Sequence, residues 1–359
     1  MSPKQIALIT RNQFGYQTDY FNYLKHLSQS YGTQNVKMYC LHSGLVNVSS
    51  DGLNVSYVGK LRESRIFRLF KLLWAGFAEL KLGKIVMVKY LPGVSVLRFS
   101  KFRKNLVIDL RTLSVSPNPS RRWLEDLLCR FEIKGHANVT AISNVVGKKI
   151  GLKKFQLLPL GADLPAKRVN PEVIEIGQAL RLVYAGTLEG RQLEVLIEAL
   201  YLASKEIPVE LRIIGDGRSR SKLVEGCAKY GVTKLVTFYG HIQHGQEFSR
   251  ILQSSHVGIV HVPPTSFYEG QPSTKLYEYW AHGLPVLCSN YPAGASEVLT
   301  GTGLIYNFDS ESLSNRIIDF YEHPEAFSSQ AISTLSSERT WSRVVDVYLM
   351  PIIQSLHGK

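Results

Sequence analysis

Residues 256–289 read HVGIVHVPPTSFYEGQPSTKLYEYWAHGLPVLCS, and this stretch holds two short apolar runs with a helical segment between them. The apolar runs are HVGIVHV (256–262) and LPVLCS (284–289), whose aliphatic and β-branched residues are typical of buried strands. The segment TKLYEYWAHG (274–283) has the apolar spacing of a short helix, and its final glycine is a common helix end. A strand, a helix and a second strand in this order predict a βαβ unit in a parallel sheet.

The same alternation runs along the whole chain and predicts two doubly wound α/β domains. Residues 161–180 contain two prolines and break the pattern, so we expect a linker between a domain over 1–165 and a domain over 178–340. A final helix over 341–359 is expected to pack back on the N-terminal domain. Ligands bind beyond the carboxyl ends of the strands in open parallel sheets, so we expect both sheets to point those ends into a cleft.

The individual elements are predicted from these periodicities. In the N-terminal half the expected strands are KQIALIT, NVKMYCL, NVSYVG, KIVMVKY, NLVIDLR, NVTAIS and FQLLPLG, and the expected helices cover 17–30, 62–82, 118–134 and 144–150. In the C-terminal half the other expected strands are LRLVYAG, VELRIIG, KLVTFYG and GLIYNF, and the other expected helices lie in QLEVLIEALYLAS, SRSKLVEGCAKYG, EFSRILQSS and SESLSNRIIDFYEH.

Composition and charge narrow the classes of partner. The 359 residues are 45% apolar, which is enough for packed cores, and no apolar run is long enough for a membrane span. The N-terminus does not have the pattern of a secretory signal, and the four scattered cysteines fit buried, reduced thiols. Residues 1–165 hold 25 Lys and Arg against 9 Asp and Glu, whereas the remainder holds 17 against 20. The basic half therefore predicts an anionic partner, such as nucleic acid, an anionic membrane surface or a pyrophosphate-linked substrate.

Charged residues follow several strands of the C-terminal half. Lys275 and Glu278 share one face at the start of the helix at 274–283, where a cation opposes the helix dipole unless an anionic ligand binds there. Glu278 can accept hydrogen bonds from the two hydroxyls of a ribose, and Glu269 can approach a sugar. Arg191 lies near the start of another helix, as an anion site requires. The alternatives are a solvated arginine in an ordinary loop and an accidental Lys–Glu pair.

Together these motifs resemble the donor domain of retaining GT-B glycosyltransferases of family 4. The resemblance rests on the loop with Gly186 and Arg191, the Gly-Asp-Gly turn at 215–217, V-x-F-x-G (236–240) and E…K-L-x-E-Y-x-A-x-G-x-P-V (269–286). It implies two Rossmann-like domains facing a central cleft. It also implies that Arg191 and Lys275 bind the donor diphosphate, that Glu278 binds the ribose, and that Glu269 contacts the transferred sugar.

The resemblance extends to a full set of expected site residues. The loop reads Gly186-Thr187 where the family has Gly-Arg, so Arg191 takes the basic role, and eight residues separate Glu269 from Glu278 where members of the family often have seven. The residues expected at the donor are Gly15, Gly186, Thr187, Asp216, Lys275, Leu276 and Glu278, and the expected catalytic residues are Asp109, Glu269, Arg191 and Lys275. No cofactor is expected, because cations of the protein replace a metal at the leaving group. No histidine spacing predicts a protein-held metal either.

The N-terminal half resembles the family in layout only. Gly15 fits the first strand-to-helix loop, near the donor phosphates. Asp109 and Arg111 end a strand in VIDLRTLS (107–114) and are expected to project from the carboxyl edge and to contact the acceptor. The alternative is a buried structural Asp–Arg pair.

A basic, aromatic helix is expected over 61–82 (LRESRIFRLFKLLWAGFAELKL). Such helices lie on membrane surfaces, although the same helix could pack its apolar side on the sheet.

From these motifs together we predict a hexosyltransferase that acts on a saccharide acceptor, expected to be lipid-linked, in surface polysaccharide or glycolipid synthesis. We expect it to retain anomeric configuration and to sit peripherally on the cytoplasmic face of the membrane. The alternatives are a nucleotide-sugar epimerase and, from another class, a nucleic-acid-binding protein, although no RNA-binding motif is present.

Overall fold

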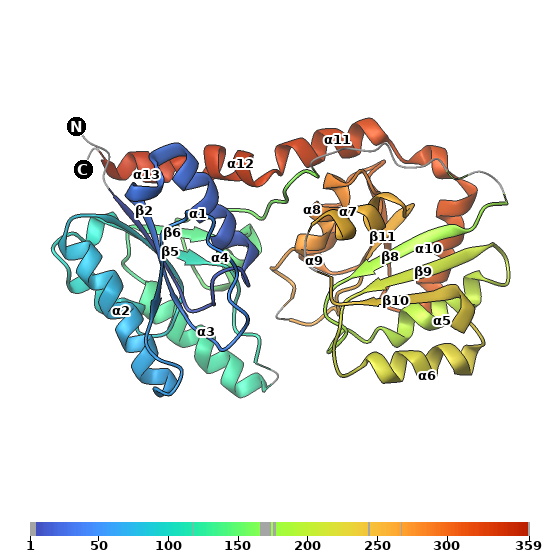
Figure 1. Ribbon diagram of the computed structural model, residues 1–359, viewed down its shortest axis with the longest axis horizontal. Helices are drawn as coiled ribbons and strands as arrows, with labels where there is room; N and C mark the ends of the chain where they lie inside the picture. The colour runs from blue at the N-terminus through green and yellow to red at the C-terminus, as the bar shows by residue number, and fades with distance from the viewer. Residues whose placement is uncertain are drawn as a thin grey trace. The chain divides into compact units, whose positions relative to one another are not determined.

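The computed structural model describes residues 5–116, 118–165, 174, 177–242, 245–266 and 268–357. The chain divides into two compact units (Figure 1). Unit 1 comprises Met1–Leu160 and Trp341–Lys359, and unit 2 comprises Gly161–Thr340. Within the expected linker at 161–180, residues 166–173, 175 and 176 lie outside the described residues.

Unit 1 contains a seven-stranded parallel sheet in the order β3-β2-β1-β4-β5-β6-β7. The chain starts in the middle of the sheet, winds to one edge and then returns past β1 to build the other half. This order is that of a Rossmann-like doubly wound sheet, with its switch point between β1 and β4. The strands are β1 (Ile6–Thr10), β2 (Val36–Leu41), β3 (Val55–Val58), β4 (Ile85–Lys89), β5 (Leu106–Leu110), β6 (Asn138–Ala141) and β7 (Gln156–Leu157).

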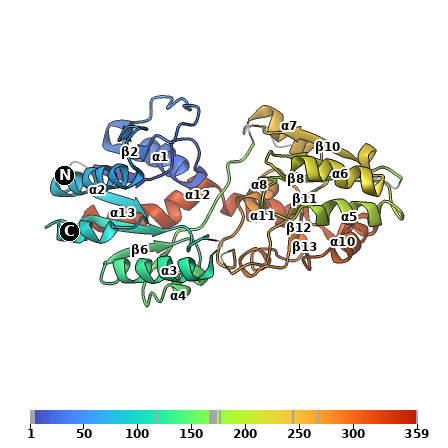
Figure 2. The same ribbon diagram turned by 90° about the horizontal axis from the view of Figure 1, so that it is seen from below.

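Helices cover both faces of this sheet (Figures 1 and 2). On one face α1 (Thr18–Tyr31) packs against the C-terminal segment, where the rings of Tyr23 and Trp341 meet edge to face at 5.9 Å. On the other face α2 (Arg65–Lys81) and α3 (Pro119–Ile133) pack on either side of η2 (Val94–Phe99). The remaining elements of unit 1 are η1 (Thr33–Asn35), η3 (Arg103–Asn105), α4 (Asn144–Lys149), α12 (Trp341–Val344), η6 (Val345–Leu349) and α13 (Met350–His357).

Unit 2 contains a six-stranded parallel sheet in the order β10-β9-β8-β11-β12-β13, with its switch point between β8 and β11. The strands are β8 (Leu180–Ala185), β9 (Val209–Ile214), β10 (Val236–Gly240), β11 (Val257–Val260), β12 (Val286–Ser289) and β13 (Gly303–Tyr306). The helical elements are α5 (Glu194–Ala203), α6 (Arg220–Tyr230), η4 (Thr233–Leu235), α7 (Gln246–Gln253), α8 (Thr274–Ala281), α9 (Pro292–Ala295), α10 (Ser310–Glu322), η5 (Pro324–Ala326) and α11 (Ser329–Glu338). Leucines, isoleucines and valines of β8, β9, β11 and α5 form its core.

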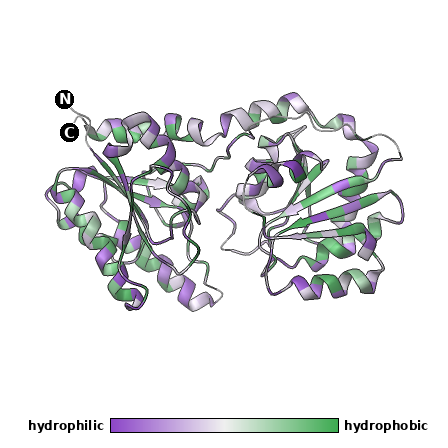
Figure 3. Cartoon of the chain, viewed as in Figure 1, coloured by the Kyte–Doolittle hydropathy of each residue, from purple (hydrophilic) through white to green (hydrophobic). Residues whose placement is uncertain are grey.

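These two sheets confirm the predicted fold class. Every expected strand and helix is present, although the strand expected at FQLLPLG shrinks to the two residues of β7. The helices α9 and α11 were not predicted, and the expected C-terminal helix is interrupted by a π-helical turn at η6. The strands are largely hydrophobic, whereas α2 and α3 alternate between hydrophobic and hydrophilic residues (Figure 3). No helix in the described part of the chain is both long and apolar enough to cross a membrane.

Candidate functional site

The loops after β8 and β9 form one packed structure at the carboxyl edge of the second sheet. The amide of Leu188 donates to the carbonyl oxygen of Asp216 at 3.2 Å. Gly215 has a φ of +151°, and a Cβ atom there would lie 1.9 Å from the carbonyl oxygen of Gly186. The glycine is therefore required for the packing of one loop on the other, a reason that the sequence did not reveal. The side chain of Asp216 is exposed and accepts a hydrogen bond from the amide of Gly217 at 2.8 Å.

Arg191 lies at the end of the first of these loops, just before α5. Its guanidinium lies 4.6 Å from the centroid of the ring of Tyr268, the residue that precedes Glu269 in the sequence. Its Nη1 atom is buried and has no hydrogen-bond partner among the described residues. Thr187 holds the same loop in place, because its carbonyl oxygen accepts from the hydroxyl of Tyr184 at 2.8 Å. The loop thus presents a fixed cation with an unused hydrogen-bond donor.

The start of α8 carries the predicted Lys–Glu pair. Ser273 caps the helix, since its side chain accepts from the amide of Lys275 at 3.3 Å. Lys275 Nζ lies 2.6 Å from Glu278 Oε2, and the two side chains are 20% and 10% exposed. Glu278 is thus nearly buried, and Lys275 is half-buried with a larger exposed part. Leu276 is fully buried.

Tyr279 fixes α8 against the switch point of the sheet. Its hydroxyl accepts from the amide of Ala185 at 2.8 Å, at the end of β8, and lies 3.4 Å from the carbonyl oxygen of Ile259 in β11. A Cβ atom at Gly258 would lie 2.4 Å from the Tyr279 ring, so this close approach requires glycine. Sequence reasoning included Tyr279 in the motif but did not assign this role, because the contact joins residues 94 positions apart.

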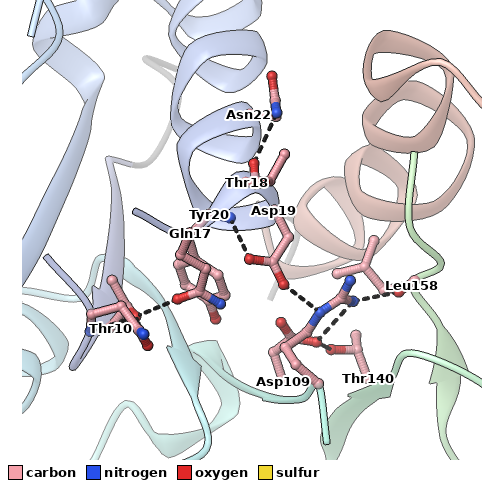
Figure 4. Close-up of polar contacts among 11 residues, drawn as sticks. Thr10, Gln17, Thr18, Asp19, Tyr20, Asn22, Asp109, Thr140 and Leu158 are labelled. Atoms are coloured by element: carbon pink, nitrogen blue, oxygen red, sulfur yellow. Dashed lines mark hydrogen bonds and ion pairs between the residues drawn. The ribbon is translucent and has the colours of Figure 1, made fainter. Parts of the chain in front are cut away.

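Asp109 and Arg111 lie inside unit 1, at the end of β5. Their exposures are 0% and 3%. Arg111 Nε donates to Asp19 Oδ2 at 2.7 Å, and Thr140 donates to Asp109 Oδ1 at 2.7 Å (Figure 4). Burial raises the pKa of Asp109 to about 6, against the opposing effect of the Arg111 charge. The expectation that both side chains project from the sheet edge is wrong, and the alternative of a buried structural pair fits them better.

The remaining predicted residues, Gly15 and Glu269, lie in a loop and in a turn. Gly15 lies in the loop after β1 with a φ of +86°, where a Cβ atom would meet Val48 at 2.5 Å. Glu269 lies in a turn before α8 and is half-buried. Within the described ranges, no group of three or more His, Cys, Asp or Glu side chains is arranged to hold a metal ion. A polar hollow beside α10 contains none of the predicted site residues.

Comparison with known families addresses the second unit directly. The family described as glycosyl transferases group 1 matches residues 179–323. The second unit is a group 1 glycosyltransferase domain. The chain is accordingly a glycosyltransferase, a transferase of the EC 2.4 class. The family match favours this activity over epimerisation or nucleic-acid binding.

Solved structures of other glycosyltransferases share the fold along the whole chain. HepE from Anabaena, solved with UDP, superposes with a TM-score of 0.73 at 14% identity, covering 99% of this chain and 98% of its own. The apo lipopolysaccharide outer core galactosyltransferase WaaB superposes with a TM-score of 0.71 at 14% identity, covering 97% of this chain and 99% of its own. Sucrose-phosphate synthase from Thermosynechococcus elongatus superposes with a TM-score of 0.67 at 17% identity, covering 99% of this chain and 98% of its own. No curated protein matches the sequence.

Proposed function

We propose that this glycosyltransferase moves a hexose from a nucleoside-diphosphate sugar to a saccharide acceptor, with retention of anomeric configuration. The observation that carries the proposal is the Lys275–Glu278 pair at the capped start of α8, with side-chain exposures of 20% and 10%. A lysine in the first turn of a helix opposes the helix dipole, and a diphosphate bound there would reverse that penalty. The carboxylate of Glu278 offers two oxygens to the two hydroxyls of a ribose.

The proposed chemistry is the stabilisation of a diphosphate leaving group. Negative charge develops on the diphosphate as the bond to the sugar breaks, and fixed cations lower the energy of that transition state. Lys275 supplies one cation, and Arg191 supplies a second with the unused donor Nη1. Glu269 is placed in the proposal beside the transferred sugar. The chain supplies these charges without a cofactor, and we propose that no metal is required.

The proposed donor and acceptor classes draw support from structures with the same fold. HepE was solved with UDP-glucose, and WaaB is a lipopolysaccharide galactosyltransferase. We propose by analogy a sugar nucleotide as donor and a lipid-linked saccharide as acceptor, in the synthesis of a surface polysaccharide or glycolipid.

The surface of unit 1 supports a membrane-bound acceptor. On α2, Ile66 is 81% exposed and Trp74 59% exposed, beside the exposed Arg65. On α3, five large apolar side chains form one exposed stripe along the helix: Trp123, Leu124, Leu127, Leu128 and Phe131. Exposed apolar surface bordered by basic residues is typical of proteins that lie on anionic membranes. We propose that unit 1 docks on the cytoplasmic face of a membrane through α2 and α3.

Donor binding and product analysis test the proposal. We expect one among UDP, GDP and TDP sugars to raise the melting temperature, because a ligand that binds only the folded state stabilises it. With that donor and a saccharide acceptor, the product should carry the anomeric configuration of the donor, as read by NMR. If no nucleotide sugar raised the melting temperature, the proposed donor class would be contradicted. A product with inverted anomeric configuration would contradict the proposed retention.

A further inference from the structure

A histidine outside the quoted motifs lies at the switch point of the second sheet. His261 directly follows β11 and is 2% exposed. Its Nδ1 atom lies 2.6 Å from the hydroxyl of Tyr306, and its Nε2 atom lies 3.3 Å from the carbonyl oxygen of Gln192. The ring also stacks on Phe308, with 4.3 Å between the centroids. His261 thus connects β13 to the residue that follows Arg191.

The partners of the ring determine its tautomer. A carbonyl oxygen can only accept a hydrogen bond, so Nε2 of His261 must carry the proton. Nδ1 is then an acceptor and takes the hydrogen bond donated by the hydroxyl of Tyr306. Burial lowers the pKa of His261 to about 4, so the ring is neutral near neutral pH and this arrangement persists.

The carbonyl group that His261 holds belongs to a backbone in an unusual conformation. Gln192 has a φ of +53°, in the left-handed region that residues other than glycine rarely adopt. Its carbonyl oxygen also accepts from the amide of Val195 at 3.2 Å, in the first turn that leads into α5. Such a backbone persists only where its surroundings fix it. Arg191, whose guanidinium stands over the ring of Tyr268, directly precedes this turn.

We propose that His261 is a positioning residue of the donor site, which holds the Gln192 carbonyl group and thereby places the guanidinium of Arg191 for the donor diphosphate. This inference rests on the proposed function, because it takes Arg191 as a diphosphate ligand. His261 itself does not touch the donor. It acts through Arg191, so its loss should matter only while Arg191 is present.

A second buried histidine on the same strand provides a matched control. His256 precedes β11 at the opposite end and is 3% exposed. Its Nδ1 atom accepts from the amide of Arg181 at 3.0 Å, at the amino end of β8. The two histidines therefore flank the same strand at opposite ends, are similarly buried, and each contacts one backbone group of another segment. A purely structural role predicts similar consequences for both.

The experiment measures nucleoside-diphosphate affinity by calorimetry in a set of variants, with UDP, GDP and TDP tested on the native protein first. His261→Phe keeps an aromatic ring on Phe308 and removes both hydrogen bonds. We expect it to weaken the affinity for the most tightly bound nucleoside diphosphate about tenfold, which corresponds to about 1.4 kcal/mol of binding free energy. His256→Phe should lower the melting temperature and leave the affinity unchanged. Tyr306→Phe, which removes one hydrogen bond and keeps the imidazole, should give a smaller loss and provides a second reading where His261→Phe folds poorly.

The double variant His261→Phe/Arg191→Ala separates the possible outcomes. Residues that act through one another give non-additive effects, so the double variant should bind no more weakly than Arg191→Ala alone. Additive losses, or equal losses in His261→Phe and His256→Phe, would overturn the positioning role. Native affinity in Arg191→Ala would instead overturn the proposed diphosphate contact. The two failures are thus distinguishable.

Discussion

The carboxyl edges of the two sheets carry similar charges and treat them differently. In unit 1, Arg111 and Asp109 are buried and paired within the unit, Arg111 with Asp19 and Asp109 with Thr140. In unit 2, Lys275 and Glu278 pair with each other and keep side-chain exposures of 20% and 10%. The comparison teaches that a charged residue after a strand does not by itself mark a ligand site. What matters is how far the fold has enclosed the charge and paired it with an opposite one.

The difference has an energetic consequence. Removing one partner of a buried ion pair leaves an uncompensated charge and costs about 3–5 kcal/mol of folding free energy. The Lys275–Glu278 pair keeps side-chain exposures of 20% and 10%, so breaking it should cost less than breaking the fully enclosed Arg111 pair. The first edge should therefore respond to substitution with lost stability, and the second with lost binding.

The largest expected effect is on the stability of unit 1. Arg111→Ala leaves the carboxylates of Asp19 and Asp109 buried with no cation between them, so we expect the unfolding free energy to fall by about 3–5 kcal/mol. Urea denaturation measures this loss. Arg121→Ala removes an exposed ion pair with Glu125 and serves as the control, with a change below about 1 kcal/mol. Equal effects of the two substitutions would contradict the structural role of Arg111.

The pH dependence of stability should have opposite signs at the two edges. The pKa of Asp109 is about 6 in the fold against 3.8 in its ordinary state, so its protonation stabilises the fold as pH falls from 6 to 4. The pKa of His261 is about 4 against 6.5, so stability is lost as pH falls through the same window. Each contribution is about 3 kcal/mol.

Two variants separate these contributions. Compared with the native protein, Asp109→Asn should lose stability more steeply on acidification, and His261→Phe should lose it less steeply. Urea denaturation at a series of pH values between 4 and 7 measures both slopes. Parallel curves for the three proteins would show that neither buried group titrates as described.

Membrane docking through unit 1 should depend on both exposed helices. We expect Arg65→Glu/Ile66→Ser on α2 and Trp123→Ser/Phe131→Ser on α3 each to weaken binding to anionic vesicles about tenfold, since a basic residue near such a surface contributes about 1 kcal/mol. All four side chains are exposed, so the fold should be kept. Lys222→Glu/Lys229→Glu on α6 of unit 2 is the control. Co-sedimentation with vesicles of graded anionic content measures the binding of each protein. If the native protein stayed in the supernatant at every composition, the proposed docking would be refuted.

A smaller effect is expected for Glu278. Glu278→Gln removes a charged acceptor for the ribose hydroxyls, so we expect it to weaken donor binding by about 1–2 kcal/mol. The native enzyme should discriminate against a 2′-deoxyribose donor, and the variant should discriminate less. Competition calorimetry with the two donors measures the difference. Equal discrimination by both proteins would remove Glu278 from the ribose site.

The strands and most helices were predictable because their apolar spacing is local information. The exposed stripe of α3 was not, although a helix was expected there at 118–134. Its apolar residues Trp123, Leu127 and Phe131 would by pattern face the sheet, yet the buried face carries Glu132. The carboxylate of Glu132 accepts from the amide of Gly93 at 2.7 Å and from the hydroxyl of Tyr90. Such distant polar partners decide which face is buried, and spacing does not reveal them.

The site was predictable in its residue types and less so in its geometry. Lys275 and Glu278 were found because both lie on one turn of one helix. Asp109 accepts from Thr140 and lies near Arg111, which in turn pairs with Asp19, and both Thr140 and Asp19 lie far away in the sequence. The helix α11, with sequence SQAISTLSSE, was missed because its few apolar residues give a weak periodic signal.

Calorimetric titration of native protein and Lys275→Ala with the preferred nucleoside diphosphate tests the central claim most directly. The claim is that the second sheet edge, where Lys275 is half-buried, binds the donor diphosphate. A lost charge-assisted contact should cost about 1.5–3 kcal/mol, which is a weakening of roughly 10- to 150-fold. The melting temperature of the free protein should fall less than in Arg111→Ala, because the Lys275–Glu278 pair is only partly enclosed. An unchanged affinity in Lys275→Ala would contradict the claim.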